Sequence, residues 1–443
     1  MDAVSFDARL AELCLVHPAM AEPTRHGADL ADPFNTVAAA SSPAKQSVDE
    51  LALFGGPVAF PEPLHVGRPN LGDRERFLAR VADLWDRRYL SNDGPYVREF
   101  EQQVARRAGA RYCVATSNGT TALELTARAL QLTGEVIVPA LTFVATAHAM
   151  TWQGLTPVFA DVDERTCCLD PRSVERLITP RTSAIVGVHL WGRTCDVEAL
   201  AWLARRHNLR LLFDAAHAFG CTHAGRPVGS LGDAEVFSFH ASKFVHACEG
   251  GAIATNDERL AERIRLLRNF GFAGQDRVVG LGTNAKMHEI SAAMGLTSLE
   301  HMGEFIAVNR RNYWLYRDRL RGLAGVCVRD YDDADRHNFQ YVVIDWDESR
   351  TGMSRDQVVA ILQAEGVLAR RYFHPGVHRM EPYASRASAP MSLPVTERIV
   401  ERSITLPTGT AVSAAEVQAV VRLLRFVCEH ADSIRARLNR HDS

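Results

Sequence analysis

The sequence lacks several features that would assign it to a familiar class of protein. Its nine cysteines form no CxxC pair and follow no regular spacing, which argues against a zinc module or a disulfide framework. No stretch approaches the roughly 20 consecutive apolar residues of a membrane-spanning helix. The formal net charge is only −3, so no overall electrostatic attraction draws the chain to nucleic acid or to an anionic membrane. Any phosphate group must therefore be bound by local features.

Two further signals are missing. Neither GxGxxG nor GxxxxGK occurs between a predicted strand and a predicted helix, which argues against a nucleotide-binding regulatory protein without catalysis. The N-terminus carries acidic residues and no basic region, so it does not resemble a signal peptide. Together with thiols that we expect to be reduced, these absences predict a cytoplasmic protein that binds neither nucleic acid nor membrane.

The length of 443 residues, with 47% hydrophobic and 23% charged residues, is typical of a globular protein with about two domains. Residues 1–46 are set apart, because 18–45 are rich in Ala, Pro, Ser and Asp and show little periodicity. We predict a mobile extension there, with a short helix at 6–16. A large domain is expected over 47–308 and a smaller one over 309–443.

The stretch 213–255 carries the two residues on which the functional prediction depends. Asp214 follows the apolar run 209–213, and Lys243 follows a second run, 236–239. Both runs predict buried strands of an α/β sheet, and open parallel sheets build ligand sites at the C-terminal ends of their strands. A lysine amine can join pyridoxal phosphate (PLP) covalently, while a carboxylate keeps its pyridine nitrogen protonated. The pair therefore indicates a PLP site.

An anion site is predicted at residues 117–120, where a strand gives way to a helix through the sequence SNGT. The first N–H groups of a helix lack intrahelical acceptors, and the helix dipole is positive at that end. Gly119 allows the backbone to approach a phosphate closely. Taken with Asp214 and Lys243, this turn is assigned to the PLP phosphate.

Three separated motifs, FDAAHAFG, SFHASK and EGGAIATND, occur in an order that resembles the DegT/DnrJ/EryC1/StrS family of PLP-dependent sugar aminotransferases. The resemblance extends from about residue 51 to about residue 411. It implies the α/β fold of type I PLP-dependent transferases, which is similar to that of aspartate aminotransferase. A large domain with a mostly parallel seven-stranded sheet and a smaller C-terminal α+β domain are then expected.

The resemblance also implies roles for individual residues. Lys243 and Asp214 would be catalytic, Phe143 would stack on the pyridine ring, and Asn284 would reach the phosphate bound by a second subunit, giving a homodimer with shared active sites. The implied cofactor-binding residues are Asn118, Gly119, Thr120, Phe143, Asp214, His217, Ser238, Lys243 and Asn284. The implied substrate residues are His189, Lys286, Tyr372 and His378, and no metal is implied.

The reaction implied is transfer of an amino group from L-glutamate to the keto carbon of a nucleotide-linked deoxysugar, with pyridoxamine phosphate as the intermediate cofactor form. C4 of dTDP-4-keto-6-deoxyglucose is the expected acceptor, in aminodeoxysugar biosynthesis for a natural product such as an antibiotic or for a surface glycan. Amination at C3 is the alternative within the same class. A sugar dehydratase on the same fold is a further alternative, which histidine at position 243 would have favoured and lysine argues against.

Overall fold

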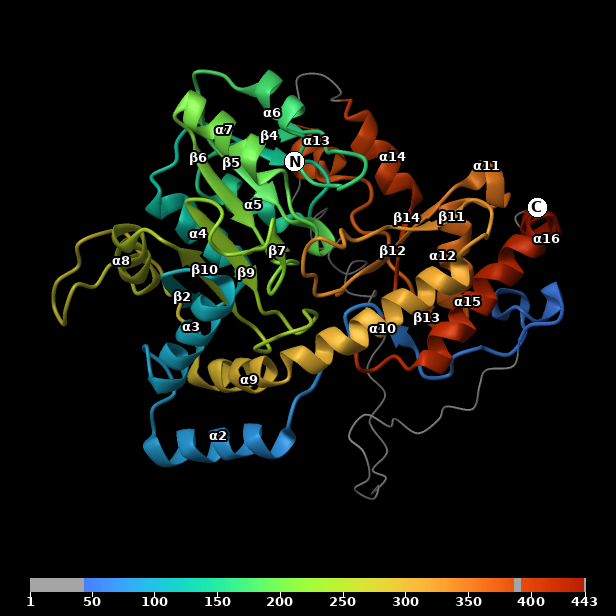
Figure 1. Cartoon of the computed structure of the whole chain (residues 1–443), viewed down its shortest axis with the longest axis horizontal. Coiled ribbons are helices and arrows are strands. Elements are labelled where there is room, and N and C mark those ends of the chain that lie inside the picture. Colours follow the sequence, from blue (N-terminus) through green and yellow to red (C-terminus); the bar gives the residue numbers. More distant parts are fainter. Residues whose placement is uncertain (1–43, 386–391, 442–443) are drawn as a thin grey trace, which may run out of the picture. The chain divides into compact units, whose positions relative to one another are not determined.

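The computed structural model describes residues 44–385 and 392–441, and its largest sheet, called the central sheet below, has seven strands (Figure 1). All its neighbouring strands pair in parallel except β10, which is antiparallel to both of its neighbours. This confirms the mostly parallel seven-stranded sheet predicted from the sequence. The strand order is β2 (Tyr112–Thr116), β10 (Gly251–Thr255), β9 (Ala234–Ser238), β6 (Arg210–Asp214), β5 (Thr182–Val188), β3 (Glu135–Pro139) and β4 (Thr156–Ala160).

Helices connect these strands and continue into the C-terminal part of the chain. They are α2 (Arg74–Arg87), α3 (Pro95–Ala108), α4 (Gly119–Ala129), α5 (Ala145–Trp152), α6 (Pro171–Leu177), α7 (Val197–His207), α8 (Glu258–Arg268), α9 (Glu289–Glu300), α10 (Met302–Leu320), α11 (Glu348–Thr351), α12 (Arg355–Ala364), α13 (Glu381–Ala384), α14 (Pro394–Arg402), α15 (Ala414–Glu429) and α16 (Ala431–His441). Short 3₁₀ turns are η2 (Val48–Glu50), η3 (Ala52–Phe54), η4 (Leu190–Gly192) and η5 (Val377–Arg379).

The central sheet is buried on both faces, as the apolar composition of its strands requires. Successive side chains of a strand point to opposite faces, and β3 shows this directly. Val136 and Val138 pack in the core beneath α4, α5 and α8, whereas Ile137 packs in the core beneath α3, α7 and α9. This double cover leaves the ends of the strands as the places where polar side chains can meet a ligand.

The C-terminal part of the chain has its own sheets and core. A three-stranded antiparallel sheet consists of β11 (Val326–Val328), β12 (Val342–Trp346) and β14 (Ser403–Leu406). A parallel pair joins β1 (Leu64–His65) to β13 (Val367–Leu368), and a small hairpin joins β7 (Thr222–His223) to β8 (Arg226–Pro227).

The predicted domain boundary after residue 308 falls inside α10 and stays a prediction. Residues well before it, Leu51, Phe60 and Leu64, share a hydrophobic core with the C-terminal strands and helices. The segment that precedes the central sheet in sequence therefore packs against the C-terminal part of the chain.

A buried ion pair attaches the start of this segment to the C-terminal part of the chain. The Nζ atom of Lys45 lies 3.0 Å from a carboxylate oxygen of Glu365, and both side chains are almost completely buried. The same amine donates to the carbonyl oxygens of Glu50 and Pro57. Residues 44–46, which the sequence places in the extension, are thus attached to the fold. The rest of that extension, with the helix predicted at 6–16, lies outside the described residues.

One predicted element differs. The sequence indicates a single closing helix from 414 to about 438, but the structure breaks it at His430, whose backbone leaves helical geometry between α15 and α16. The eight cysteines among the described residues are all free, as expected of reduced thiols. In residues 44–385 and 392–441, no helix is both long and apolar enough to cross a membrane.

Candidate active site

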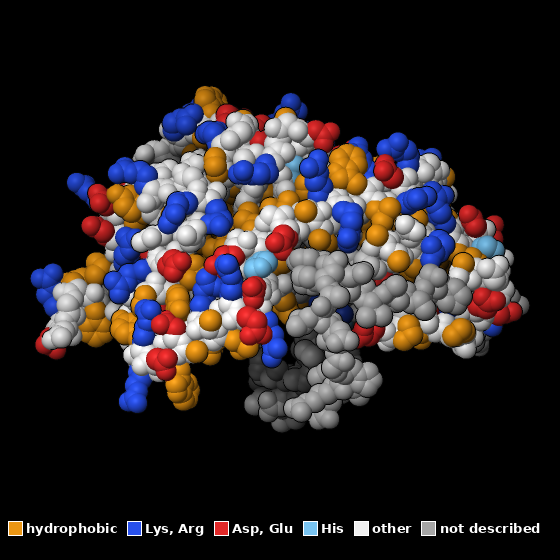
Figure 2. Space-filling view, turned by 60° about the horizontal axis from the view of Figure 1, so that its bottom comes forward, with side chains coloured by type: hydrophobic (Ala, Val, Ile, Leu, Met, Phe, Trp, Pro, Cys, Tyr) orange, Lys and Arg blue, Asp and Glu red, His pale blue; other side chains and the backbone are white. Residues whose placement is uncertain are grey.

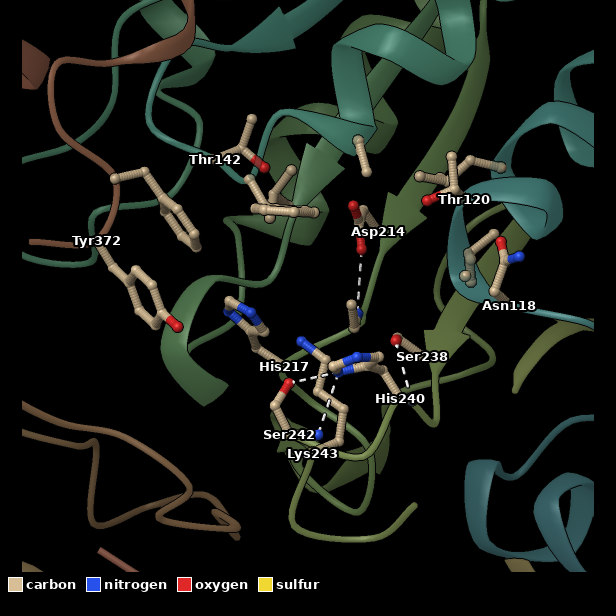
Figure 3. A pocket seen from close by; sticks show the side chains of 18 of the residues that line it. Asn118, Thr120, Thr142, Asp214, His217, Ser238, His240, Ser242, Lys243 and Tyr372 are labelled. Carbon is tan, nitrogen blue, oxygen red and sulfur yellow. Dashed lines mark hydrogen bonds between the residues drawn. The ribbon is translucent and has the colours of Figure 1, made fainter. Parts of the chain in front are cut away.

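A cavity of about 690 Å³ lies at the C-terminal ends of the parallel strands. The turns that follow β2, β3, β6 and β9 line one side of it, and segments beside β12 and β13 line the other. Asp214, His217 and Lys243 point into this space in Figure 3. The sheet edge predicted from the sequence is therefore the edge at which these residues meet.

Lys243 lies five residues beyond the end of β9, in a tight turn held by its own N–H group, which donates to the carbonyl oxygen of His240. Burial lowers the pKa of its amine to about 8, while the nearby Asp214 carboxylate opposes that shift. About a tenth of the amine is then neutral at pH 7, far more than for a free lysine, and the neutral amine is the nucleophilic form. The backbone, rather than the side chain, holds this residue in place.

Asp214 is the last residue of β6 and is only 7% exposed. Its two carboxylate oxygens each accept a hydrogen bond. The hydroxyl of Thr146 donates to Oδ2 at 2.8 Å, and the N–H of Ala216 donates to Oδ1 at 3.1 Å. Burial raises the pKa of this carboxyl group, and these two donors together with Lys243 act against that rise. The donors favour the ionised form that pairing with a pyridinium requires.

The anion site predicted at residues 117–120 is built from the N-terminus of α4 and the end of β9. Asn118 caps the helix, since its side chain accepts from the N–H of Thr121 at 2.8 Å. A β-carbon on Gly119 would stand 3.0 Å from the β-carbon of Ser238, which is a tight contact, so glycine leaves this approach more open than a larger residue would. Gly119, Thr120 and Ser238 all line the cavity.

His217 is held in one tautomer. Its Nδ1 accepts a hydrogen bond from the N–H of Trp191 at 3.3 Å, so the proton of the neutral ring lies on Nε2. Burial, with the charge of Lys243 adding to it, holds the pKa of His217 well below its usual range. The ring is therefore neutral and can donate one hydrogen bond. Phe143 and Phe373 both line the cavity, and their ring centroids lie 6.0 Å apart.

The opposite wall comes from the C-terminal part of the chain and includes Tyr341, Arg370 and Tyr372. Arg370 is exposed, and among the residues that the structure describes its guanidinium has no hydrogen-bond or ion-pair partner. Burial raises the pKa of the neighbouring Tyr372, against the effect of the Arg370 charge. This arginine places an uncompensated positive charge on the wall of the cavity.

Several lining residues were not among those predicted from the sequence. They include Thr142, Ser242 and Tyr341, together with His240, whose Nδ1 lies 2.8 Å from the hydroxyl of Ser242. Thr146 was missed as well and lies behind Asp214. For His240 and Ser242 the position between Ser238 and Lys243 was a usable signal. For Tyr341 no signal existed in the sequence alone.

The structure does not support direct substrate contacts for His189 and His378. His189 is fully buried, stacks on Phe213 with ring centroids 4.5 Å apart, and accepts from the N–H of Cys195. His378 is buried beside Glu397, with Nε2 3.5 Å from the carboxylate. Neither lines the cavity, because each histidine packs against its own neighbours.

Asn284 and Lys286 also lie outside the cavity of their own chain. Asn284 is exposed and forms an isolated bridge with Asn269. Lys286 is half-buried, donates to the side chain of Asn269 at 3.0 Å, and lies over the ring of Phe270. The predicted contribution of Asn284 to a second subunit stays a prediction.

The cavity has the chemistry that PLP needs. It joins a buried amine of lowered pKa, a buried carboxylate held by two donors, and a helix N-terminus at which a β-carbon would intrude. A seven-stranded, mostly parallel sheet that carries this set at its strand ends defines a fold type I PLP-dependent enzyme. The residues present thus fit the cofactor implied by the sequence.

Comparison with known proteins agrees with this class. Residues 72–425 match the DegT/DnrJ/EryC1/StrS aminotransferase family, and the chain belongs to that family. It is 35% identical over 366 residues to dTDP-4-amino-4,6-dideoxy-D-glucose transaminase of Shigella dysenteriae, covering 83% of this chain and 99% of the relative. It is 38% identical over 368 residues to GDP-perosamine synthase of Caulobacter vibrioides, covering 82% and 97%.

Solved structures are similar as well. The structure of DesI in the presence of its TDP-sugar product has a TM-score of 0.86 and 54% identity, and it covers 89% of this chain and 100% of that one. S. venezuelae DesV has a TM-score of 0.75 and 31% identity, covering 80% and 95%. The protein is therefore a PLP-dependent nucleotide-sugar aminotransferase of deoxysugar biosynthesis, which uses a nucleotide sugar and an amino donor.

Proposed function

We propose that this enzyme transfers the amino group of L-glutamate to C4 of dTDP-4-keto-6-deoxyglucose. The observation that carries the proposal is the likeness to DesI. The two sequences are 54% identical over the full length of the DesI chain, and the DesI structure is that of the protein in the presence of its TDP-sugar product. The Shigella dysenteriae relative is named for a dTDP sugar with its amino group at C4. The cavity volume of about 690 Å³ is within the range of sites for small-molecule ligands and cofactors.

The residues of the cavity divide the chemistry among them. Bound PLP supplies an electron sink for the carbon that loses its proton. Lys243 would hold the cofactor covalently, and its amine, when free, would serve as the base that moves this proton between carbon atoms. Asp214 would keep the pyridine nitrogen charged, and His217, whose Nδ1 accepts from Trp191, would have its Nε2 proton available for the cofactor. Ser238 and the N-terminus of α4 hold the phosphate.

The deciding experiment supplies purified enzyme with PLP, L-glutamate and a panel of keto sugars. The panel contains dTDP-4-keto-6-deoxyglucose, a dTDP-linked 3-keto-6-deoxyhexose and a GDP-linked 4-keto-6-deoxyhexose. We expect the first to be aminated with the highest kcat/KM, with NMR placing nitrogen on C4. Preference for the 3-keto sugar would instead support C3 amination.

A GDP-linked acceptor is the second candidate, because the Caulobacter vibrioides relative is 38% identical and is named GDP-perosamine synthase. Comparison of the dTDP- and GDP-linked 4-keto sugars separates the two, since they differ in the nucleotide.

A cytoplasmic location is proposed from the free cysteines of the described residues, which suit a reducing compartment. The pathway is proposed to supply an aminodeoxysugar for a natural product or a surface glycan.

Replacing Arg370 with glutamine tests which anionic group the cavity wall holds. Both substrates are anionic, through the diphosphate of the sugar or the carboxylates of glutamate. We expect KM for the substrate that Arg370 contacts to rise about tenfold with kcat nearly unchanged, because a binding contact that is equal in ground and transition states is lost. Steady-state kinetics with each substrate varied in turn gives both values.

The neighbouring Arg371 provides the matched control. Its guanidinium pairs with Asp356 at 3.0 Å and does not line the cavity, so Arg371→Gln should leave both KM values near those of the wild type. If Arg370→Gln behaves like Arg371→Gln, the charge on the cavity wall has no part in substrate binding.

We propose a homodimer in which Asn284 completes the phosphate site of the partner subunit. Large apolar side chains lie exposed near this residue in sequence and on α2, including Trp85, Phe270, Leu281 and Ile290. Figure 2 shows exposed hydrophobic side chains among charged ones on the face turned forward from the α2 side. Such exposure is typical of surfaces that another protein covers.

Replacement of Asn284 with alanine should weaken PLP retention about tenfold, since one hydrogen bond to a charged phosphate is removed. Equilibrium dialysis of the dimer measures the affinity. Mixed dimers of Asn284→Ala and Lys243→Ala subunits should regain activity, because one of their two sites then has both residues intact. Unchanged PLP affinity in a confirmed dimer, with no gain on mixing, would contradict the shared site.

A further inference from the structure

Two threonine hydroxyls stand in line behind Asp214, at the start of α5. The hydroxyl of Thr146 donates to Oδ2 of Asp214 at 2.8 Å, and it lies 2.9 Å from the hydroxyl of Thr142. The two threonines are four positions apart, with Thr142 in the segment that precedes α5 and Thr146 in the first turn of the helix. Both side chains are almost fully buried, and among the described residues no charged partner other than Asp214 is bonded to either one.

The direction of the two hydrogen bonds follows from counting the protons of the hydroxyl groups. A hydroxyl has one proton to donate, and that of Thr146 is given to the carboxylate. Thr146 can therefore only accept from Thr142, so the donation runs from Thr142 to Thr146 to Asp214. A hydroxyl that accepts one hydrogen bond becomes a stronger donor, and consecutive bonds in a buried site reinforce one another.

Asp214 needs this support because the protein removes it from water. A buried carboxylate is protonated more readily, and a protonated one could not keep a pyridine nitrogen charged. The only other hydrogen bond to the carboxylate among the described residues comes from the Ala216 N–H, a single neutral donor at 3.1 Å. The N-terminus of α5 adds the positive end of a helix dipole on the same side.

We propose that Thr142 and Thr146 form a hydroxyl relay that keeps Asp214 ionised and fixes the orientation of its carboxylate toward the cofactor. Thr146 does not line the cavity, so it acts through Asp214 and is a positioning residue rather than a catalytic one. Thr142 lines the cavity and supplies the outer donor. This inference rests on the proposed role of Asp214.

The test removes the hydroxyl while keeping the shape of the side chain. In holoenzyme carrying Thr146→Val, we expect kcat to fall at least tenfold with KM nearly unchanged. The low-pH limb of the kcat profile should move upward by about one pH unit, because Asp214 loses a donor that favours its charged form. The pH midpoint of the absorbance of bound PLP should move in the same direction, which is a readout independent of turnover. Thr146→Ser should restore both.

Thr126→Val is the matched control. Its hydroxyl is also buried in a helix, but it donates to the carbonyl oxygen of Ala122, and Thr126 does not line the cavity. If Thr146→Val and Thr126→Val give the same profiles, the relay has no effect and the proposal is overturned. A wild-type enzyme that aminates no keto sugar would contradict the proposed acceptor, while the PLP absorbance would still decide on the relay.

A double-mutant cycle tests the order of the two hydroxyls. Thr142→Val alone should shift the low-pH limb in the same direction as Thr146→Val, by a smaller amount. In a Thr146→Val background, Thr142→Val should add nothing, since its route to Asp214 is already broken. Additive shifts would show two independent threonines and would refute the relay. The Thr142→Val measurement also decides the question if Thr146→Val does not fold.

Discussion

Lys243→Ala should reduce transamination to below about one ten-thousandth of the wild-type rate, because the proposed function gives the same amine the roles of covalent anchor and of base for the proton shift. The fold should remain intact, since the turn is held by the backbone bond from the N–H of Lys243 to His240 rather than by the side chain. Circular dichroism and kcat/KM with L-glutamate and the aminated acceptor give both results.

The chain makes the anchor easy to locate. It has only three lysines, Lys45, Lys243 and Lys286, and Lys45 is engaged by Glu365. Reduction of the wild type with borohydride should leave a pyridoxyl group on the peptide of Lys243, detected by mass spectrometry, and Lys243→Ala should carry none. Appreciable transamination by the pure variant, or a label on Lys286, would remove the basis of the site assignment.

Asp214→Asn should lower kcat by about a thousandfold, which is the scale on which one preorganised electrostatic group contributes to a rate. The amide has nearly the same shape, and its oxygen can still accept from Thr146 or from Ala216. What is lost is the negative charge that is proposed to keep the pyridine nitrogen protonated. Single-turnover measurement of the half-reaction with glutamate isolates this step.

Asp233→Asn serves as the comparison for this variant. Asp233 precedes β9, accepts from the N–H of Leu211 at 2.8 Å, and does not line the cavity. We expect it to change stability slightly and the half-reaction hardly at all. If both variants reduce the half-reaction equally, the effect of Asp214→Asn is structural and its electrostatic role is wrong.

The central sheet and its polar ends were readable from the sequence because buried strands are short apolar runs with recognisable boundaries. The run before Asp214 became β6 and the run before Lys243 became β9, each within a residue or two. The turn at Gly119 could be assigned only together with Asp214 and Lys243, since small residues between a strand and a helix also form simple helix caps. These are local signals, and the structure places their residues around one cavity.

Side-chain direction was not readable. Arg370 and Arg371 are adjacent and chemically identical, yet one lines the cavity and the other pairs with Asp356. His189 follows β5 at the same sheet edge as Asp214, but its ring is fully buried and stacks on Phe213. No motif marks Thr146, because its hydrogen-bond acceptor, Asp214, lies 68 positions further along the chain. Such distinctions depend on packing between segments that are remote in sequence.

The two walls of the cavity come from different parts of the chain. Residues of the proposed cofactor site lie on turns between strands of the central sheet, whereas Arg370 and Tyr372 follow β13, more than 120 positions after Lys243 by the printed numbering. Substitutions on the second wall can therefore accumulate without disturbing the first. Such an arrangement lets a lineage exchange one acceptor for another while its amino-transfer chemistry is inherited unchanged. Relatives matched by this chain are named for both dTDP-linked and GDP-linked sugars.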